Sequence, residues 1–240
     1  MPRLSIVIPT RRIDQVLTAW LHGLLGQIPD VEILVVEPED RRPAQAEPPE
    51  RNECATSEPV GMADSPWRLL YAPRGRGTQC NAGARAAVGE LLLFLHDDTE
   101  LPANAMACID RAFDDLEVGA ACFRLRFDTD HWLLRIYAAF SRFESVMTTF
   151  GDQGLVIRRR VFDELGGFPD WPLFEDVEIA RRIRRRSRLV KLPATVTTSA
   201  VRFERNGLLR QQFLNATLML RFLLGADPED LRVRYERQRR

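Results

Sequence analysis

Short runs of large apolar residues alternate along the chain with longer stretches of mixed character. The first run, Ser5–Ile8, is rich in β-branched residues and ends at Pro9, which is typical of a buried strand entering a loop. The next segment, Ile13–Leu25, carries apolar residues at helical spacing, and Val31–Val36 is a second apolar run. This strand–helix–strand order predicts an α/β fold with a doubly wound, mostly parallel sheet.

The same alternation continues to the end of the chain. Further strands are predicted over Trp67–Tyr71, Leu91–Leu95, Gly119–Phe127, the segment ending at Ile157, and Leu189–Leu192. Further helices are predicted over Pro73–Val88, Pro102–Phe113, His131–Met147, Arg158–Leu165 and Leu208–Leu224. Two connections are expected to be irregular: Pro38–Pro66, rich in Pro, Glu, Arg and Ala and interpreted as mobile, and the polar segment from Leu192 through Arg205.

Composition excludes several classes of protein. The 240 residues are 45% hydrophobic and 28% charged, and 34 basic residues balance 34 acidic ones, so no overall field attracts nucleic acid. Lys191 is the only lysine, which rules out a lysine-based phosphate loop elsewhere. The four cysteines lack zinc-site spacing and suggest reduced thiols in a cytoplasm. Ser5–Ile8 is too short for a signal-peptide core or a membrane span. Asn215 and Arg221 interrupt the most apolar later segment, Phe213–Leu224, so it is not expected to be a transmembrane helix.

The central apolar run ends abruptly in polar chemistry. Leu91–Leu95 is followed at once by His96, Asp97 and Asp98. In open α/β sheets ligands bind beyond the carboxyl ends of the strands, so these side chains are candidates for a site. The alternative is that the two acids cap the next helix and favour its first turn.

Two other segments carry candidate chemistry. Arg74-Gly75-Arg76-Gly77 precedes a helix, where backbone N–H groups and arginines suit an anion, although a plain loop with solvated arginines has the same composition. Phe174–Glu178 delivers Glu175, Asp176 and Glu178 to another helix start, where acids are also favoured by the helix dipole alone.

Taken together, these motifs resemble the family 2 glycosyltransferases of GT-A fold. The resemblance is carried in order by Ser5–Thr10, Leu95–Thr99, Gly166–Phe168 and Phe174–Glu178. Three further segments, Arg74–Gly83, Phe150–Gly154 and Thr198–Gly207, are similar to the subgroup of arsenosugar-biosynthesis-type glycosyltransferases. The resemblance implies a GT-A, Rossmann-like, doubly wound, mostly parallel sheet with helices on both faces.

The resemblance also implies a donor site for a nucleotide diphosphate sugar, with a UDP-sugar the first candidate. Pro9 and Thr10 are expected against the nucleotide, and Glu37 near its base or ribose. The residues expected to line the donor or acceptor are Pro9, Thr10, Glu37, Arg74, Arg76, Asn81, Asp97, Gly151, Asp152, Gln153, Arg202 and Arg205. Arg202 and Arg205 lie where related proteins close a basic or aromatic motif over the pyrophosphate.

The family's metal motif aligns with His96-Asp97-Asp98, with histidine in place of the first acid. Asp98 is therefore the expected ligand of Mg²⁺ or Mn²⁺, and His96 a second one unless it is only a hydrogen-bonded structural residue. Asp176 aligns with the catalytic base of an inverting transfer, and Glu175 is expected to support the loop or reach the acceptor.

We predict a single domain over residues 1–240, with a nucleotide-sugar half at 1–100, an acceptor and catalytic half at 101–207, and a terminal helix and tail at 208–240. A non-catalytic nucleotide-sugar binder is the alternative. A nucleotidyltransferase is disfavoured because Arg11 and Arg12 follow the first strand without glycines. The arginine-rich helix over 181–188 and the amphipathic last helix suggest peripheral contact with anionic lipid at the inner face of a membrane, against the alternative of a solvated face.

Overall fold

The computed structural model describes residues 2–28, 30–43, 66–145, 151–201 and 208–237. The strands are β1 (Leu4–Pro9), β2 (Glu32–Pro38), β3 (Arg68–Ala72), β4 (Leu91–Phe94), β5 (Thr99–Glu100), β6 (Val118–Phe127), β7 (Leu155–Arg158) and β8 (Arg188–Thr198). The helices are α1 (Gln15–Gln27), α2 (Arg76–Ala86), α3 (Ala105–Phe113), α4 (Trp132–Phe140), α5 (Arg159–Glu164), α6 (Glu175–Arg186), α8 (Leu208–Leu223) and α9 (Pro228–Arg237), with short 3₁₀ turns η1 (Glu39–Arg41) and η2 (Gly151–Gln153).

These strands form one sheet in the order β3-β2-β1-β4-β7-β6-β8-β5. The pairs β1–β2, β1–β4, β2–β3 and β6–β8 are parallel, whereas β4–β7, β6–β7 and β5–β8 are antiparallel. The mostly parallel α/β sheet predicted from the sequence is confirmed. The antiparallel β7 separates a parallel half that begins at the N-terminus from the later strands.

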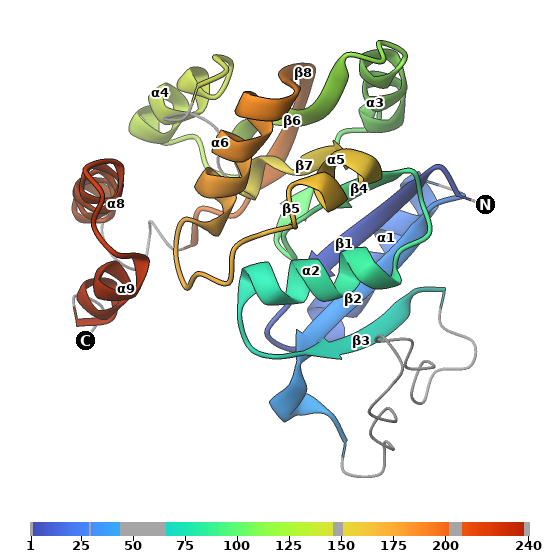
Figure 1. Ribbon diagram of the computed structural model, residues 1–240, viewed down its shortest axis with the longest axis horizontal. Helices are drawn as coiled ribbons and strands as arrows, with labels where there is room; N and C mark the ends of the chain where they lie inside the picture. The colour runs from blue at the N-terminus through green and yellow to red at the C-terminus, as the bar shows by residue number, and fades with distance from the viewer. Residues whose placement is uncertain (1, 29, 44–65, 146–150, 202–207, 238–240) are drawn as a thin grey trace.

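Helices cover both faces of the sheet (Figure 1). One hydrophobic core contains the inward residues of α1, α3 and α4, and the other contains those of α2, α5 and α6. The central strands β1 and β4 contribute side chains to both cores, because successive residues of a strand point to opposite faces. Their near-continuous apolar runs follow from this double burial.

Two predicted boundaries in the second half are wrong. β8 continues to Thr198, although a polar loop was expected after Leu192. Leu192, Ala194 and Val196 are buried at alternate positions, as in a strand with one face on the core. Pro193 argues against a strand in the sequence, but a register shift between β8 and β6 accommodates it in the structure. α4 ends before Ser141, which donates to the Ala138 carbonyl at 2.6 Å instead of continuing the predicted helix.

The C-terminal helices pack on the segment that precedes α6. Val177 shares a third apolar cluster with residues of α8 and α9, and the Phe174 ring stacks on Phe222 with centroids 4.8 Å apart. Helix α9 was not expected from the sequence, because Leu231 is its one side chain buried in the described part of the chain. No helix within that part has the length and hydropathy that a membrane crossing requires.

The close approach of α2 to the sheet allows a direct test of the fold. A methyl group on Gly83 would overlap Val7 Cγ1 and stand 3.2 Å from Val36 Cγ2. Gly83→Ala is therefore expected to lower the free energy of unfolding by about 1–3 kcal/mol through overpacking. Gly23→Ala on α1, where nothing lies within 4 Å, is the matched control and should be stabilising by up to about 1 kcal/mol. Equal midpoints in denaturant for the two variants would contradict this packing.

Candidate functional site

The central strand β4 delivers polar residues to the carboxyl edge of the sheet. It lies between β1 and β7, all four of its residues are buried, and the Leu95 N–H continues its pairing by donating to the Val7 carbonyl at 3.0 Å. His96 follows directly. The ends of parallel strands β1 and β2 lie at the same edge, which is where ligands bind in open α/β sheets.

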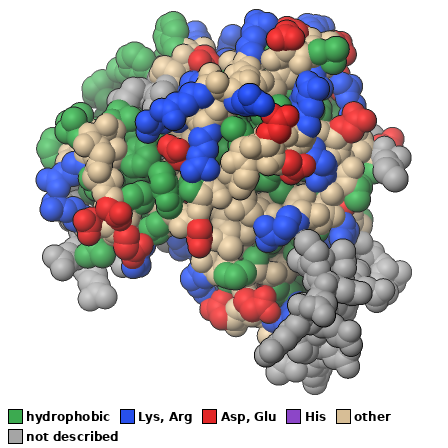
Figure 2. Space-filling view, in the orientation of Figure 1, with side chains coloured by type: hydrophobic (Ala, Val, Ile, Leu, Met, Phe, Trp, Pro, Cys, Tyr) green, Lys and Arg blue, Asp and Glu red, His purple; other side chains and the backbone are tan. Residues whose placement is uncertain are grey.

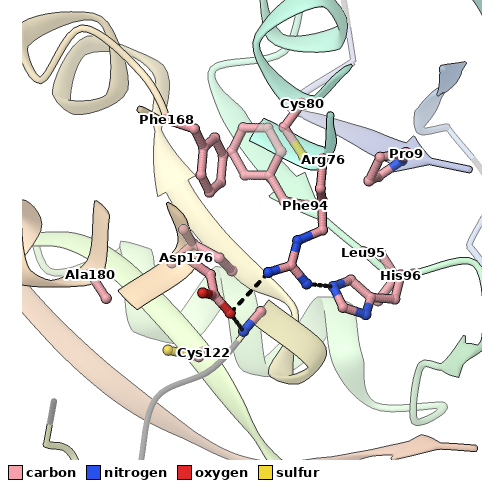
Figure 3. A pocket seen from close by; sticks show the side chains of 12 residues that line it. Pro9, Arg76, Cys80, Phe94, Leu95, His96, Cys122, Phe168, Asp176 and Ala180 are labelled. Carbon is pink, nitrogen blue, oxygen red and sulfur yellow. Dashed lines mark hydrogen bonds and ion pairs between the residues drawn. The ribbon is translucent and has the colours of Figure 1, made fainter. Parts of the chain in front are cut away.

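Arg76, at the start of α2, joins this strand end to the start of α6. Its Nη1 group lies 2.8 Å from His96 Nε2 and its Nη2 group 3.2 Å from Asp176 Oδ2 (Figure 3). Its Nε group donates to Glu175. A guanidinium group can only donate, so His96 Nε2 accepts and the imidazole proton resides on Nδ1. Burial disfavours the Arg76 cation, but the two carboxylates outweigh it and raise its pKa.

The two acids of α6 differ in exposure and role. The Glu175 side chain is 3% exposed and that of Asp176 is 16% exposed. Burial raises the pKa of Glu175, and the Arg76 guanidinium opposes that shift. Asp176 Oδ2 accepts from the Gly151 N–H at 2.7 Å and Oδ1 from the Val177 N–H at 2.8 Å. Glu175 is thus an anchor for Arg76, whereas Asp176 is held in place but reachable.

The backbone before α6 is strained where it turns into the site. Phe174, the N-cap residue of α6, has φ 63° and ψ 18°, a left-handed conformation that costs a non-glycine residue on the order of 1–3 kcal/mol. Its packing on Phe222 of α8 supports the conformation. The C-terminal helices therefore help to hold Glu175 and Asp176 at the mouth of the site.

A cleft of about 470 Å³, its open mouth included, lies between these elements. Asp176, Arg76 and His96 all line it, and Figure 3 shows Arg76 between the other two side chains. Apolar groups, among them Phe94 and Phe168, form another part of the wall, with their rings 4.9 Å apart. A ligand in this cleft would contact the Asp176 carboxylate, the His96 imidazole and the Arg76 guanidinium, and the rest of the wall is largely apolar.

The strand-end acids contribute differently from His96. Asp97 Oδ2 accepts from Thr10 Oγ1 at 2.6 Å, which ties the loop after β1 to the loop after β4. Asp98 Oδ1 lies 3.4 Å from Thr99 Oγ1 and 3.5 Å from Thr198 Oγ1, and both distances are long for hydrogen bonds. Neither acid is among the residues that line the cleft within the described chain.

These residues fit a divalent cation only in part. Within the described ranges no three His, Cys, Asp or Glu side chains are grouped to hold a metal. The donor set is Asp98 with His96, whose Nε2 now accepts from Arg76. Mg²⁺ and related ions are commonly bound through one or two protein carboxylates together with phosphate groups of the substrate. Asp98 therefore suits an ion that a bound diphosphate also coordinates, and it does not suit an ion held by protein ligands alone.

Three other predicted contacts have internal partners. The Glu37 carboxylate is buried and accepts from the Ile13 N–H. Asn81 binds both backbone groups of Phe168, each at 2.9 Å, so it fixes the loop before α6. Arg74 pairs with Asp40 at 2.6 Å, with both side chains 60% exposed, away from the Arg76 cluster. Their expected contacts with a nucleotide stay predictions.

The Gly151–Gln153 turn adjoins the cleft through Gly151, which lines it. Gln153 is buried and accepts from Lys191. Burial raises the pKa of Tyr137 well above its usual value, with the carboxylates of Asp152 and Asp176 adding to the effect. The expected sites Arg202 and Arg205 lie outside the described residues.

Comparison with known proteins identifies the group to which the chain is related. Residues 5–156 match the family model described as Glycosyl transferase family 2. The chain belongs to this family. None of the curated proteins matches this family 2 domain.

Solved structures give the same fold. A mannosyltransferase, PcManGT from Pyrobaculum calidifontis in complex with GDP-Man and Mn²⁺, is 19% identical with a TM-score of 0.57, over 90% of this chain and 64% of that one. TarS residues 1–349 from S. aureus is 13% identical with a TM-score of 0.58, over 82% of this chain and 60% of that one. Its complex with UDP-GlcNAc is also 13% identical, with a TM-score of 0.53 over 82% and 58% of the two chains. The family 2 domain thus spans less than two thirds of these chains, which share its GT-A fold.

Sequence reasoning missed two internal supports of this glycosyltransferase domain. Gln79 is buried and its Nε2 donates to the carbonyls of Thr10 at 2.8 Å and Val36 at 2.6 Å, which fixes the ends of β1 and β2. A lone glutamine on the buried Ala, Cys and Gly face of α2 was the available signal. Lys191 is the second support, and its being the only lysine was the sole hint.

Proposed function

We propose that this family 2 domain transfers a sugar from a nucleoside diphosphate sugar to a hydroxyl acceptor, with inversion and with the help of a divalent cation. The observation that supports this most is that Asp176 and His96 line one cleft and are joined there by Arg76. Inverting transfer requires a carboxylate on one side of the anomeric carbon and positive charge where the diphosphate leaves on the other. The cleft offers both types of group.

In the proposed reaction Asp176 accepts the proton of the acceptor hydroxyl while that oxygen bonds to the anomeric carbon. The bond from this carbon to the diphosphate breaks, and its electron pair stays on the phosphate oxygen. The Gly151 and Val177 N–H groups keep the Asp176 carboxylate oriented. Arg76, anchored by Glu175, supplies N–H donors and charge for the leaving diphosphate.

A bound Mg²⁺ or Mn²⁺ ion would relieve the charge of the leaving diphosphate. Asp98 is the residue proposed to hold it, with His96 as a second ligand if Arg76 turns away. The mannosyltransferase structure contains GDP-Man and Mn²⁺, and TarS structures contain UDP or UDP-GlcNAc, which supports a nucleotide sugar as donor. We propose a UDP-sugar as the first candidate for the donor. We also propose that the chain is related to the arsenosugar-biosynthesis-type subgroup, and this relationship does not identify the acceptor.

Donor and metal binding can be measured without knowing the acceptor. UDP-GlcNAc or GDP-mannose with Mn²⁺ is expected to raise the melting temperature, since a ligand at 100 times its Kd stabilises the folded state by about 2.7 kcal/mol. In Asp98→Asn the increment that Mn²⁺ adds should disappear. Asp110→Asn on α3, where the exposed acid pairs with Arg3, is the control and should keep it. An unchanged Mn²⁺ increment in Asp98→Asn would remove this residue from the metal site.

The alternative, a nucleotide-sugar binder without activity, makes a different prediction from the same preparation. Both functions require the donor to stabilise the protein. The enzyme, unlike the binder, should release nucleoside diphosphate from the donor, because water can replace the acceptor in the cleft. Release that stays at the uncatalysed rate with every bound nucleotide sugar and with Mn²⁺ would favour the binder.

Peripheral contact with an anionic membrane also remains a proposal, and the structure changes its basis. Most arginines of α6 and the start of β8 pair with carboxylates: Arg182 with Glu178 at 3.0 Å, Arg184 with Glu144 at 2.5 Å, Arg186 with Glu164 at 3.3 Å and Arg188 with Asp115 at 2.9 Å. Their attraction to lipid is correspondingly reduced. The support now comes from exposed apolar residues of α4 and α8.

Trp132, Ile136 and Phe140 are exposed on one face of α4, and hydrophobic side chains gather on the side of the molecule where α4 and α8 lie (Figure 2). Exposed Arg135 and Arg142 accompany them. Vesicles with phosphatidylglycerol should therefore carry the protein in flotation at low salt, and Trp132→Ser with Phe140→Ser should reduce it. Absence of flotation at low and high salt would end this proposal.

A further inference from the structure

Lys191 lies on the same side of the sheet as the cleft. It is in register with Cys122 of β6, and Cys122 is in register with Leu155 of β7. Residues opposite each other on neighbouring strands point to the same face of a sheet. Because Cys122 and Leu155 line the cleft, Lys191 belongs to the same side of the sheet.

The contacts of Lys191 are internal. Its Nζ group donates to the side-chain oxygen of Gln153, whose residue is 1% exposed. Burial lowers the pKa of Lys191, and the charged groups around it are Glu144, Arg184 and Asp152. Glu144 and Arg184 pair with each other at 2.5 Å. Burial of a cation is costly unless the cation is paired or hydrogen-bonded, and the Gln153 side chain is one of the groups that bind it.

Gln153 belongs to the same 3₁₀ turn as Gly151, the residue that holds Asp176. The Gly151 N–H donates to Asp176 Oδ2 at 2.7 Å, and a Cβ atom on Gly151 would lie 3.0 Å from that oxygen and 3.2 Å from Arg76 Nη1. The carboxylate and the turn are therefore in close contact. Displacement of the turn would therefore disturb the hydrogen bond that orients the Asp176 carboxylate.

We propose that Lys191 is a positioning residue for Asp176, acting through Gln153 and the turn that carries Gly151. Lys191 binds Gln153, the turn keeps its place, and the Gly151 N–H orients the carboxylate toward the cleft. This rests on the proposed role of Asp176 as base. It adds a residue that neither the motifs nor the resemblance indicates.

Lys191→Met removes the ammonium group while keeping most of the side-chain length. We expect kcat for donor hydrolysis, measured with whichever of UDP-GlcNAc and GDP-mannose is bound, to fall about 10- to 100-fold, with the donor KM nearly unchanged. In an Asp176→Asn background the same change should have no further effect, because Lys191 acts through Asp176. Arg188→Met, which removes an exposed cation from the same strand, is the control and should behave as wild type.

A second measurement needs no turnover. The Gly151 amide should exchange with solvent deuterium at least about tenfold faster in Lys191→Met, while the amides of β1 and β4 keep their rates. If Lys191→Met does not fold, Gln153→Leu removes the same contact from its other end and carries the same expectations. Equal Gly151 exchange, or a loss of kcat that is additive with Asp176→Asn, would overturn the inference. If the Gly151 amide exchanges faster in Lys191→Met but the wild-type protein does not hydrolyse the donor, the result contradicts the proposed sugar transfer and not the contact between Lys191 and the turn.

Discussion

Replacement of Asp176 by asparagine is expected to lower the rate of sugar transfer or donor hydrolysis about 10²- to 10⁴-fold, the usual contribution of a positioned base. Asparagine has nearly the same shape, and its carbonyl oxygen can still accept from the Gly151 N–H. It cannot take a proton from a hydroxyl group at neutral pH. Turnover should therefore be lost while the fold and the donor affinity are kept, which steady-state rates and donor-induced thermal shifts measure separately.

The matched control is Glu178→Gln, two residues along the same helix. Glu178 lies in the first turn of α6 like Asp176, but it pairs with Arg182 and Arg181 instead of lining the cleft. A general effect of removing an acid from this helix start would appear in both variants. Hydrolysis within tenfold of wild type in Asp176→Asn would mean that another group serves as base.

Two local signals in the sequence indicate the segments that form the cleft, whereas the role of Asp176 as base is what the family resemblance implies and stays a proposal. An apolar run that stops at His96 marks a strand end, and a Gly-Gly-Phe turn followed by Glu175 and Asp176 marks a helix start. In the structure His96 and Asp176 line one cleft. Asp98 was expected to face the same site as Asp176. Of His96, Asp97 and Asp98, however, His96 is the residue that lines the cleft within the described chain.

Partners within the site are not predictable in the same way. Nothing in the local pattern indicates that Asn81 would bind the backbone of Phe168, or that Lys191 would reach Gln153, because these contacts join residues 87 and 38 positions apart. The Lys191–Gln153 pair depends on the order and register of β7, β6 and β8, and the Asn81–Phe168 pair depends on the packing of α2 against the segment before α6. The hydrophobic pattern constrains the elements, but it does not determine which polar side chains meet at their ends.

The same limit explains why the two arginines before α2 look alike in the sequence and differ in the structure. Arg74 forms an exposed pair with Asp40, whereas Arg76, two residues later, binds Glu175, Asp176 and His96. The chain turns at Gly75, with φ 149°, and Gly77 approaches Pro169 so closely that a Cβ atom there would lie 2.7 Å from its carbonyl oxygen. This close approach brings the start of α2 against the start of α6.

Arg76→Met is accordingly expected to be the most destabilising change in the site. It leaves the Glu175 carboxylate, 3% exposed, without its cation, and because Arg76 itself is 36% exposed the cost is expected to be about 1–3 kcal/mol, below that of a fully buried ion pair. Burial without Arg76 would raise the pKa of Glu175 further above its unfolded value, so the folded state would bind an extra proton. The deficit in unfolding free energy should therefore be small below about pH 4.3 and grow as the pH rises, which denaturant titrations at several pH values can measure.

Two further variants separate stability from chemistry. Arg3→Met, which removes the exposed arginine that pairs with Asp110 on α3, should leave both stability and turnover close to wild type. Arg76→Met combined with Glu175→Gln removes both charges and should recover much of the lost stability, since no uncompensated carboxylate remains buried. Turnover should stay low in the double variant, because the cation proposed to meet the leaving diphosphate is still absent. Recovery of turnover together with stability would show that Arg76 serves the fold alone, and the positive charge of the reaction would then have to come from elsewhere in the cleft.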